Sequence, residues 1–405
     1  MRRLWTALAI ATIAVLGGGT AQSVAAADTI TIGFTVSETG ALNVDSLAQL
    51  HGFELWRDQV NAAGGIKVGG KGYQIRFVSY DDQSRPDRVQ QLYSRLITQD
   101  NADFLFSPYS SNLVATAAII SEQYGKVMLT TGAAEEKTYQ LGNKYLFQLY
   151  SPAKDYLAAA MDLMKKKDPT AKVALVYSDD GFSKAVAAAA KARAKELSQE
   201  VVMDEAYAPS TTDFGPIINK MIGAHADVMI GGGHYPDGTT LARQMFDQKA
   251  PMKFVCMLVA PDSPQFASLG DAAVGLAVPS QWEPSVTYKP QFGPDPATFG
   301  RDFQAKYGIE AGYHAAGGYA AGLILQQAIA KAGGLDQEKV TAALNATDAT
   351  IFYGHVKFAT DPQNHGLQLG HDMVLAQWQK KNGQLVKEVV WPDAAKTADL
   401  LYPMR

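Results

Sequence analysis

The regular alternation of strand-like and helix-like segments is the feature that most constrains how this chain can fold. Short apolar runs typical of buried strands occupy 29–34, 73–80, 103–106, 126–131, 172–177, 200–204, 227–231 and 254–259. Helical patterns lie between them, at 52–62, 88–99, 113–124, 184–197, 214–223 and 239–248. Such alternation predicts parallel sheets covered by helices on both faces. The pattern occurs as two successive sets that meet near residue 150, which predicts two doubly wound α/β lobes.

The last third of the chain departs from this alternation. Beyond Pro279 it has Pro- and Gly-rich loops over 284–296, followed by helical patterns at 299–307 and 314–332. Segments 372–379 and 385–391 have the pattern of a β-hairpin. A chain of 405 residues is also too long for a single hydrophobic core. Length and pattern therefore agree on two lobes.

The N-terminus has the pattern of a secretory signal peptide. Arg2 and Arg3 precede an apolar run that ends at Leu16, and Ala25 to Ala27 supply the small residues of a cleavage site. The run is too short to span a bilayer, which needs about 20 residues. We expect cleavage after Ala27 and a mature periplasmic protein that begins with the strand at Thr29.

Charge and cysteine content exclude several classes of protein. The net charge is −4 and no basic block occurs, so binding to nucleic acid or to a membrane surface is not expected. The single cysteine, Cys256, lies in an apolar run, which predicts a buried side chain and no internal disulfide.

Motifs for catalysis are missing from the sequence. The glycine-rich segment 65–72 nearly matches a P-loop, but Gly72 replaces the required Ser or Thr and the segment joins a helix to a strand. We interpret it as a turn with glycines at positive φ. No nucleophile elbow and no metal-ligand spacing occurs. The sequence therefore predicts a protein that is not an enzyme and that needs no cofactor or metal.

Four junctions between a strand and the next helix carry the candidate ligand-binding residues. Ligands of open parallel sheets bind beyond the carboxyl ends of the strands, where helix N-termini favour anions. Ser110 and Ser111 follow the strand at 103–106, where either could cap the helix or hold a ligand carboxylate. The other candidates are Thr131, Ala133 and Ala134 at the second junction, Phe182 at the third, His234, Tyr235 and Asp237 at the fourth, and Trp282 further on.

The alternative role of each aromatic candidate is structural. Phe182 could stack on a ligand or pack against its own helix. Trp282, Tyr313 and His314 provide aromatic and polar surface near the junction of the lobes, which would suit a larger apolar ligand, although large aromatic residues are more often core. A tight turn explains the three glycines before His234 but not His234 itself, so a role in binding is favoured there.

These junctions and several further motifs resemble the leucine/isoleucine/valine-binding protein family, the type I solute-binding proteins of bacterial ABC uptake systems. The matching pieces are Gly40 with Gly52, the segment 60–66, Ser79 to Asp82 with Pro86, the serines at 110–111, the turn 232–236 and the segment 354–358. The resemblance implies two lobes with a ligand in the cleft between them. By position, Ser110, Ser111, Ala133, Ala134, Phe182 and His234 would line that cleft.

The resemblance also implies where the lobes begin and end. Three crossings would lie near 149–153, 278–281 and 373–376 and would act as the hinge on which the lobes close. Lobe 1 would comprise 28–148 with 280–373, and lobe 2 would comprise 149–279 with 374–405.

Two positions depart from the family. The cysteines of the family's first-lobe disulfide would fall at Ser84 and Tyr109, so that bridge is absent. The acidic residue that holds the ligand's ammonium would fall near Leu258, where no carboxylate stands, and Asp237 and Asp262 are the nearest candidates. This favours an apolar or aromatic carboxylate without a free α-amino group, while either aspartate leaves an ordinary amino acid open.

The expected function is that of a monomeric periplasmic receptor. It would capture a small carboxylate-bearing ligand, an amino acid or an aromatic or apolar acid, and deliver it to an ABC permease in the inner membrane. The alternative is a ligand sensor of the same fold that signals to a receptor or regulator in response to an amide or organic acid.

Overall fold

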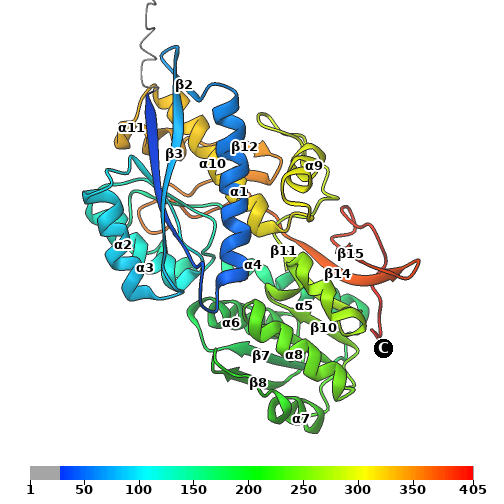
Figure 1. Ribbon diagram of the computed structural model, residues 1–405. Coiled ribbons are helices and arrows are strands. Elements are labelled where there is room, and N and C mark those ends of the chain that lie inside the picture. Colours follow the sequence, from blue (N-terminus) through cyan, green and yellow to red (C-terminus); the bar gives the residue numbers. More distant parts are fainter. Residues whose placement is uncertain (1–27, 405) are drawn as a thin grey trace, which may run out of the picture.

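The computed structural model describes residues 28–404 and has two α/β lobes, one above the other in Figure 1. The predicted signal peptide lies outside the described residues. The upper lobe contains a six-stranded sheet of order β2-β3-β1-β4-β5-β6. Its strands are β1 (Thr29–Val36), β2 (Ile66–Val68), β3 (Lys71–Asp81), β4 (Phe104–Phe106), β5 (Met128–Thr130) and β6 (Leu146–Gln148).

The lower lobe contains a seven-stranded sheet of order β15-β14-β11-β10-β9-β7-β8. Its strands are β7 (Val173–Ser178), β8 (Val201–Tyr207), β9 (Val228–Gly232), β10 (Phe254–Met257), β11 (Leu276–Ser280), β14 (Val374–Lys381) and β15 (Gln384–Trp391). The predicted C-terminal hairpin is confirmed as β14 and β15, which pair antiparallel with each other and extend the edge at β11. A separate small hairpin joins β12 (Asp348–Ile351) to β13 (Gly354–Lys357).

The two sheets share one topology. Counted along the chain, the five parallel strands of each sheet lie in the order 2-1-3-4-5, namely β3-β1-β4-β5-β6 above and β8-β7-β9-β10-β11 below. The predicted fold class, two doubly wound α/β lobes, is therefore confirmed. This strand order places a topological switch point between β1 and β4 in one lobe and between β7 and β9 in the other.

Helices cover both faces of each sheet, as the strand–helix alternation requires. They are α1 (Asn43–Ala62), α2 (Pro86–Thr98), α3 (Ser111–Gln123), α4 (Ala153–Tyr156), α5 (Ala158–Lys167), α6 (Gly181–Glu196), α7 (Gly215–Gly223), α8 (Tyr235–Asp247), α9 (Pro296–Tyr307), α10 (Tyr313–Ala332) and α11 (Gln337–Asn345). Each lobe therefore has a hydrophobic core on both sides of its sheet. Cys256 is buried in β10, as predicted.

The chain passes between the lobes three times, and the crossing segments are bonded to one another. Ser151 follows β6, and its backbone N–H donates to the Gln281 side-chain oxygen at 3.0 Å. Its hydroxyl donates to the carbonyl of His371 at 3.0 Å, and the His371 ring donates to the Gln281 carbonyl at 2.8 Å. The three crossings therefore share one buried set of hydrogen bonds.

Several elements differ from the sequence-based prediction. The structure adds β2, β6, β11 and the helices α4, α5 and α11, most of which are too short for a periodic pattern to be recognised. The segment 65–72 forms the turn of the β2–β3 hairpin, with Gly69 and Gly70 at φ values of 56° and 84°, as the glycine-turn interpretation requires.

The largest boundary error concerns α1. The predicted start was Gly52, whereas the helix begins at Asn43. Gly52 lies in the middle of the helix because α1 packs closely on α10: a Cβ at this position would stand 2.0 Å from the carbonyl oxygen of Ala315. Gly52 therefore permits close packing of the two helices and does not mark a helix boundary.

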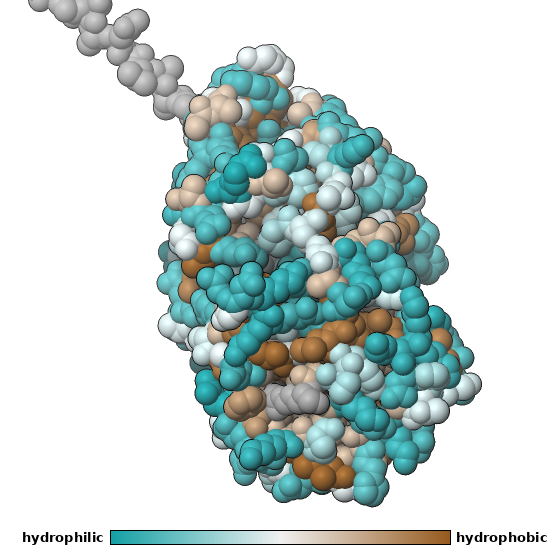
Figure 2. Space-filling view, turned by 90° about the vertical axis from the view of Figure 1, so that its right-hand side faces the viewer, coloured by the Kyte–Doolittle hydropathy of each residue, from teal (hydrophilic) through white to brown (hydrophobic). Residues whose placement is uncertain are grey.

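The surface is mainly hydrophilic on the face shown in Figure 2, and apolar side chains gather in a band on the lower lobe. Between residues 28 and 404, none of the helices combines the length and the apolar character needed to cross a membrane.

Candidate ligand-binding cleft

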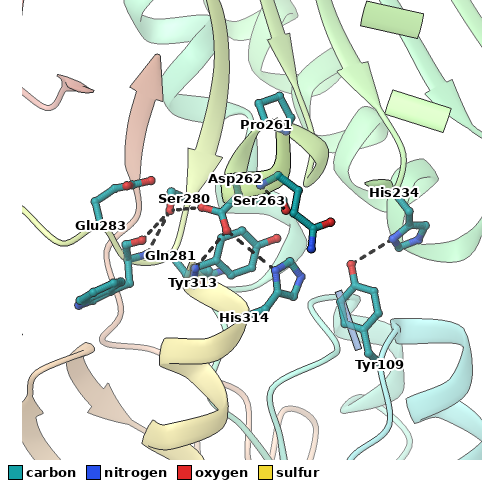
Figure 3. A network of polar contacts seen from close by, with 12 residues as sticks. Tyr109, His234, Pro261, Asp262, Ser263, Ser280, Gln281, Glu283, Tyr313 and His314 are labelled. Atoms are coloured by element: carbon teal, nitrogen blue, oxygen red, sulfur yellow. Dashed lines mark hydrogen bonds and ion pairs between the residues drawn. The ribbon is translucent and has the colours of Figure 1, made fainter. Parts of the chain in front are cut away.

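The carboxyl ends of the two parallel sheets face each other across a narrow cleft. The loop after β4 carries Tyr109 from one lobe, and the loop after β9 carries His234 from the other. The Tyr109 hydroxyl lies 3.1 Å from Nδ1 of His234, which is hydrogen-bonding distance (Figure 3). Both loops leave strands at the switch points, so the cleft lies where ligands of such sheets bind.

Ser110 and Ser111 begin α3 on the upper side of the cleft. Ser110 is the N-cap residue, with extended backbone, yet its side chain makes no capping hydrogen bond. The Ser111 hydroxyl accepts from the backbone N–H groups of Ala134 and Glu135, at 3.2 and 3.4 Å. Ser111 therefore ties α3 to the loop after β5, while Ser110 and the N-terminal N–H groups of α3 remain suited to an anion.

Phe182 and His234 form the opposite wall. Phe182 lies in the first turn of α6, with its ring 5.2 Å from that of Tyr156 and 5.9 Å from that of His234. The His234 backbone N–H donates to the Asp237 carboxylate at 2.9 Å, which fixes the start of α8. Its Nε2 lies 3.9 Å from a carboxylate oxygen of Asp180.

A small cavity lies between these two walls. Six of the residues around it come from the predicted junctions, namely Ser110, Ser111, Gly132, Ala134, Phe182 and His234, and it is completed by Tyr109, Tyr150, Tyr156, Val259 and Tyr313. Its volume is about 10 Å³, room for about one water molecule. Ligand pockets measure about 300–1,000 Å³, so a solute can enter only when the lobes move apart.

A second cavity of about 190 Å³ lies beside the first, and Asp45 is its most unusual lining residue. Asp45 stands in the first turn of α1, is 2% exposed, and has one carboxylate oxygen without a hydrogen-bond partner among the described residues. Burial raises the pKa of Asp45 to about 7, against the lowering influence of His234 and of the Tyr235 backbone N–H.

His314 lines the same cavity from the N-terminus of α10. It is 4% exposed, and its Nε2 is likewise unpartnered within residues 28–404. Burial, helped by the charges of His234 and Lys387, lowers the pKa of His314 to about 3. His314 is therefore neutral at pH 7. Figure 3 shows it between Asp262 and Tyr109.

Asp262 differs from Asp45 because both of its oxygens are engaged. One accepts from Lys387 at 3.0 Å and from the Ser280 hydroxyl at 3.2 Å, and the other accepts from the Tyr313 backbone N–H at 3.0 Å. Lys387 also pairs with Glu283 at 3.0 Å. Burial raises the pKa of Glu283 to about 7. Burial alone would lower the pKa of Lys387, but the charges of Asp262 and Glu283 outweigh burial and raise this pKa.

Five of the predicted site residues line neither of these two cavities, namely Thr131, Ala133, Tyr235, Asp237 and Trp282. Thr131 and Ala133 are fully buried beneath the cleft, and Tyr235 is half-buried against the core of the lower lobe. The prediction for Trp282 needs correction, because its side chain is fully buried in the core of the upper lobe. Its indole N–H donates to the Phe352 carbonyl at 3.1 Å and its ring packs edge-on against Phe299.

Asp237, another predicted residue, lines a neighbouring cavity of about 200 Å³ with Ser110 and His234. Both of its oxygens are already engaged, by the His234 backbone N–H and by the Tyr207 hydroxyl at 2.5 Å. Sequence reasoning missed Asp45, Tyr109, Tyr150 and Tyr156. A signal for Asp45 existed, because it lies in the first junction after β1, at the switch point between β1 and β4.

The cleft carries no metal-binding cluster. Over the part of the chain that the structure describes, no three His, Cys, Asp or Glu side chains are grouped so that they could hold a metal ion.

The sequence pattern of the periplasmic binding protein family matches residues 29–384 of this chain. The chain belongs to this family. A Leu/Ile/Val-binding protein homolog 7 from Brucella suis biovar 1 is 24% identical over 413 residues, which cover 98% of each chain. The predicted resemblance to the leucine/isoleucine/valine-binding proteins is confirmed.

Solved structures of family members agree on the fold. The substrate-binding protein of a branched-chain amino-acid transporter from Streptococcus pneumoniae, solved with isoleucine, superposes with a TM-score of 0.76 at 22% identity, covering 90% of this chain and all of that one. A solute-binding protein of an ABC transporter from R. palustris, solved with 4-hydroxybenzoate, also gives a TM-score of 0.76 at 22% identity, covering 89% of this chain and 96% of that one. At these identities the likeness establishes the fold.

Proposed function

We propose that this protein captures a small carboxylate-bearing solute between its lobes and delivers it to an ABC permease of the inner membrane. The observation that carries the proposal is the start of α3. Its N-terminal N–H groups and the unbonded Ser110 hydroxyl face Phe182 and His234 of the opposite lobe. Backbone N–H groups at a helix N-terminus favour a carboxylate, and the two aromatic rings offer apolar surface to the rest of the solute.

Closure of the lobes would couple binding to delivery. A ligand that contacts both walls gains most in the closed state, so binding shifts the population toward closure. The proposed hinge is the set of crossings at 149–153, 278–281 and 373–376, with lobe 1 at 28–148 and 280–373 and lobe 2 at 149–279 and 374–405. The hydrogen bonds among Ser151, Gln281 and His371 support this assignment, because they hold the crossings together as one unit.

The comparisons support the solute class at the same coarse level. Relatives carry names of leucine, isoleucine and valine binding, and structures of the same fold hold isoleucine or 4-hydroxybenzoate. These ligands share a carboxylate, the group that the start of α3 is suited to bind.

A thermal-shift screen tests the proposal. Amino acids, aliphatic acids, aromatic acids and uncharged amides would be added to the purified mature protein. A solute present at 100 times its dissociation constant stabilises the fold by about 2.7 kcal/mol, and only carboxylate-bearing solutes should do so. Ser110→Ala should reduce the shift, whereas Ser94→Ala, a half-buried serine whose hydroxyl donates to the Gln90 carbonyl within α2, should not.

The screen also states what would contradict the proposal. Stabilisation by amides alone, or equal stabilisation of the wild type and Ser110→Ala, would show that no ligand carboxylate binds at the start of α3. Delivery is tested separately, by comparing uptake of the labelled solute in cells with and without the gene.

A further inference from the structure

Asp45 is a buried acid with an incomplete set of hydrogen bonds. Its carboxylate is 2% exposed, it borders a cavity of about 190 Å³, and one of its oxygens lacks a hydrogen bond within the described chain. An unpaired buried charge is costly unless a partner arrives. Buried polar groups left open in this way need an explanation, and a ligand is one.

The cavity beside Asp45 is suited to a cation. Its polar and charged lining residues are Asn43, Asp45, His51, Asp262, Ser263, Gln265, Glu310 and His314. Three of these are acids and none is a lysine or arginine, and His314 is neutral because burial depresses its pKa. Leu47, Phe303 and Ile309 contribute apolar surface to the same cavity. A cationic group there would meet an open carboxylate without displacing an existing ion pair.

The acidic cavity lies next to the anion-binding end of the cleft. Tyr109 lies between the two: its hydroxyl is 3.1 Å from Nδ1 of His234, and burial together with the charge of the nearby Asp45 raises the pKa of Tyr109. The next residue, Ser110, is the N-cap of α3. The N-terminus of α3 and the unpaired carboxylate of Asp45 thus border adjoining cavities of one cleft. This charge pattern is complementary to a zwitterion.

We propose that Asp45 binds an ammonium group of the solute, so that the ligand of this protein carries both a carboxylate and an amino group. The inference rests on the proposed function and narrows its solute class. The apolar residue Leu258 led to the expectation of a ligand without an amino group. The inference reverses this expectation, because Asp45 supplies a carboxylate from the other lobe. Asp237 and Asp262 are less suited to this role, since both oxygens of each are already bonded.

The charged and titratable groups around Asp45 set how its binding depends on pH. Those that face it are His234 and Asp237 of the α8 region with the Tyr235 backbone N–H, Tyr109 before α3, Asp262 after β10, and His314 of α10. Burial and the two neighbouring aspartates hold the pKa of Asp45 up, whereas His234 lowers it. An arriving ammonium group would lower it further, so binding below pH 7 should release a proton.

Matched ligand pairs test the inference by calorimetry at pH 8. The pairs are L-leucine with 4-methylpentanoate and L-phenylalanine with 3-phenylpropanoate, each differing by the amino group alone. In the wild type at least one amino acid should bind about 10- to 100-fold more tightly than its deaminated partner, the range expected for a hydrogen bond to a charged group. Asp45→Asn should reduce this preference to a few-fold. Asp58→Asn, an exposed acid on the same helix, should leave it unchanged.

The outcomes separate this inference from the proposed function. If the deaminated acids bind as tightly as the amino acids, or if Asp45→Asn keeps the preference, the role of Asp45 is wrong while solute capture stands. If no carboxylate-bearing solute of the thermal-shift screen binds, the proposed solute class fails and the inference fails with it.

Proton release gives a second test that needs no variant. At pH 6 the Asp45 carboxyl is mostly protonated, so binding of the amino acid to the wild type should release close to one proton. The release is measured from binding enthalpies in buffers of low and high ionisation enthalpy. Equal enthalpies in the two buffers would overturn the inference. Asp45→Asn, if it folds, should show no release.

Discussion

Asp262 and Asp45 are two buried aspartates that border the same cavity yet have opposite surroundings. Asp262 accepts hydrogen bonds from Lys387, from Ser280 and from the N–H that begins α10, and the lysine pairs with Glu283 as well. Asp45 has no lysine or arginine among the residues that line its cavity, and one of its oxygens is open within residues 28–404. Two acids of one cavity thus differ in their bonding: the oxygens of Asp262 are engaged by the fold, and one oxygen of Asp45 is left open.

The same contrast separates the two serines of α3. The Ser111 hydroxyl accepts two backbone N–H groups of the loop after β5, whereas the Ser110 side chain makes no capping bond and borders two cavities. A polar group whose bonds are complete serves the structure, and one left open at a cleft is available to a solute. Variants at the bonded and the open positions should therefore fail in different assays.

The largest effect is expected at the bonded acid cluster. Lys387→Met leaves Asp262 and Glu283 buried without a cation and should lower the free energy of unfolding by about 3–5 kcal/mol. Urea denaturation measures the loss. Lys380→Met, on the preceding strand β14, provides the control, because it breaks an exposed pair with Asp271 and should cost under about 1 kcal/mol. Equal losses in the two variants would mean that the buried cluster contributes no more than a surface pair.

Asp45 should show the opposite behaviour in the ligand-free protein. Its pKa of about 7 in the folded protein lies above 3.8, the ordinary value of an aspartate. The folded protein therefore binds this proton more tightly than the unfolded chain does. As a result, the free energy of unfolding falls as the pH rises from about 3.8 to about 7. At pH 7.5, Asp45→Asn should be more stable than the wild type by about 2–4 kcal/mol.

The difference between the two proteins should shrink as the pH falls to 5, because Asp45 is then mostly protonated. Chemical denaturation of both proteins at pH 5, 6 and 7.5 measures this difference in the free energy of unfolding. Any pH dependence that remains in the variant includes the contribution of Glu283, whose pKa is also raised to about 7. A variant less stable than the wild type at pH 7.5 would show that Asp45 is paired in solution.

The serines should differ in which property they change. Ser110→Ala removes a hydrogen bond to a charged ligand and should weaken binding by about 1.5–3 kcal/mol with little change in unfolding. Ser111→Ala should weaken binding and also destabilise the ligand-free protein, by about 1 kcal/mol, because the backbone N–H groups of Ala134 and Glu135 lose their acceptor. Calorimetry with the tightest solute of the screen and urea denaturation provide both numbers. Loss of stability in Ser110→Ala alone would reverse the assignment.

The smallest effect on ligand binding is expected at Trp282. Its indole N–H is bonded inside the upper lobe, so Trp282→Phe should leave the dissociation constant within about twofold while costing about 1–2 kcal/mol of stability. Phe182→Leu, which changes the cleft wall itself, is the comparison variant and should weaken binding. A large change in affinity for Trp282→Phe would show that Trp282 does contribute to ligand binding.

Sequence patterns predicted the site where it depends on local order. The junction after the strand at 103–106 and the glycine run before His234 were recognisable, because strand ends and helix starts follow from apolar runs and capping residues. The sequence did not show whether the Trp282 side chain lies in the core or in the cleft, because an aromatic residue near a crossing has the same local pattern in both cases. Asp45 lies before the predicted helix start at Gly52, whereas the helix itself begins at Asn43.

The sequence by itself determined the two α/β lobes, the places where strands end and the family to which the chain belongs, because these follow from periodicity and from motifs that are local in the chain. Only the tertiary structure decided which polar groups are satisfied. Asp45 is buried by α8 and by the segment around Asp262, which lie far along the chain, and Asp262 is neutralised by Lys387 from the C-terminal hairpin. Burial and pairing depend on which distant segments meet, and no local pattern carries that information.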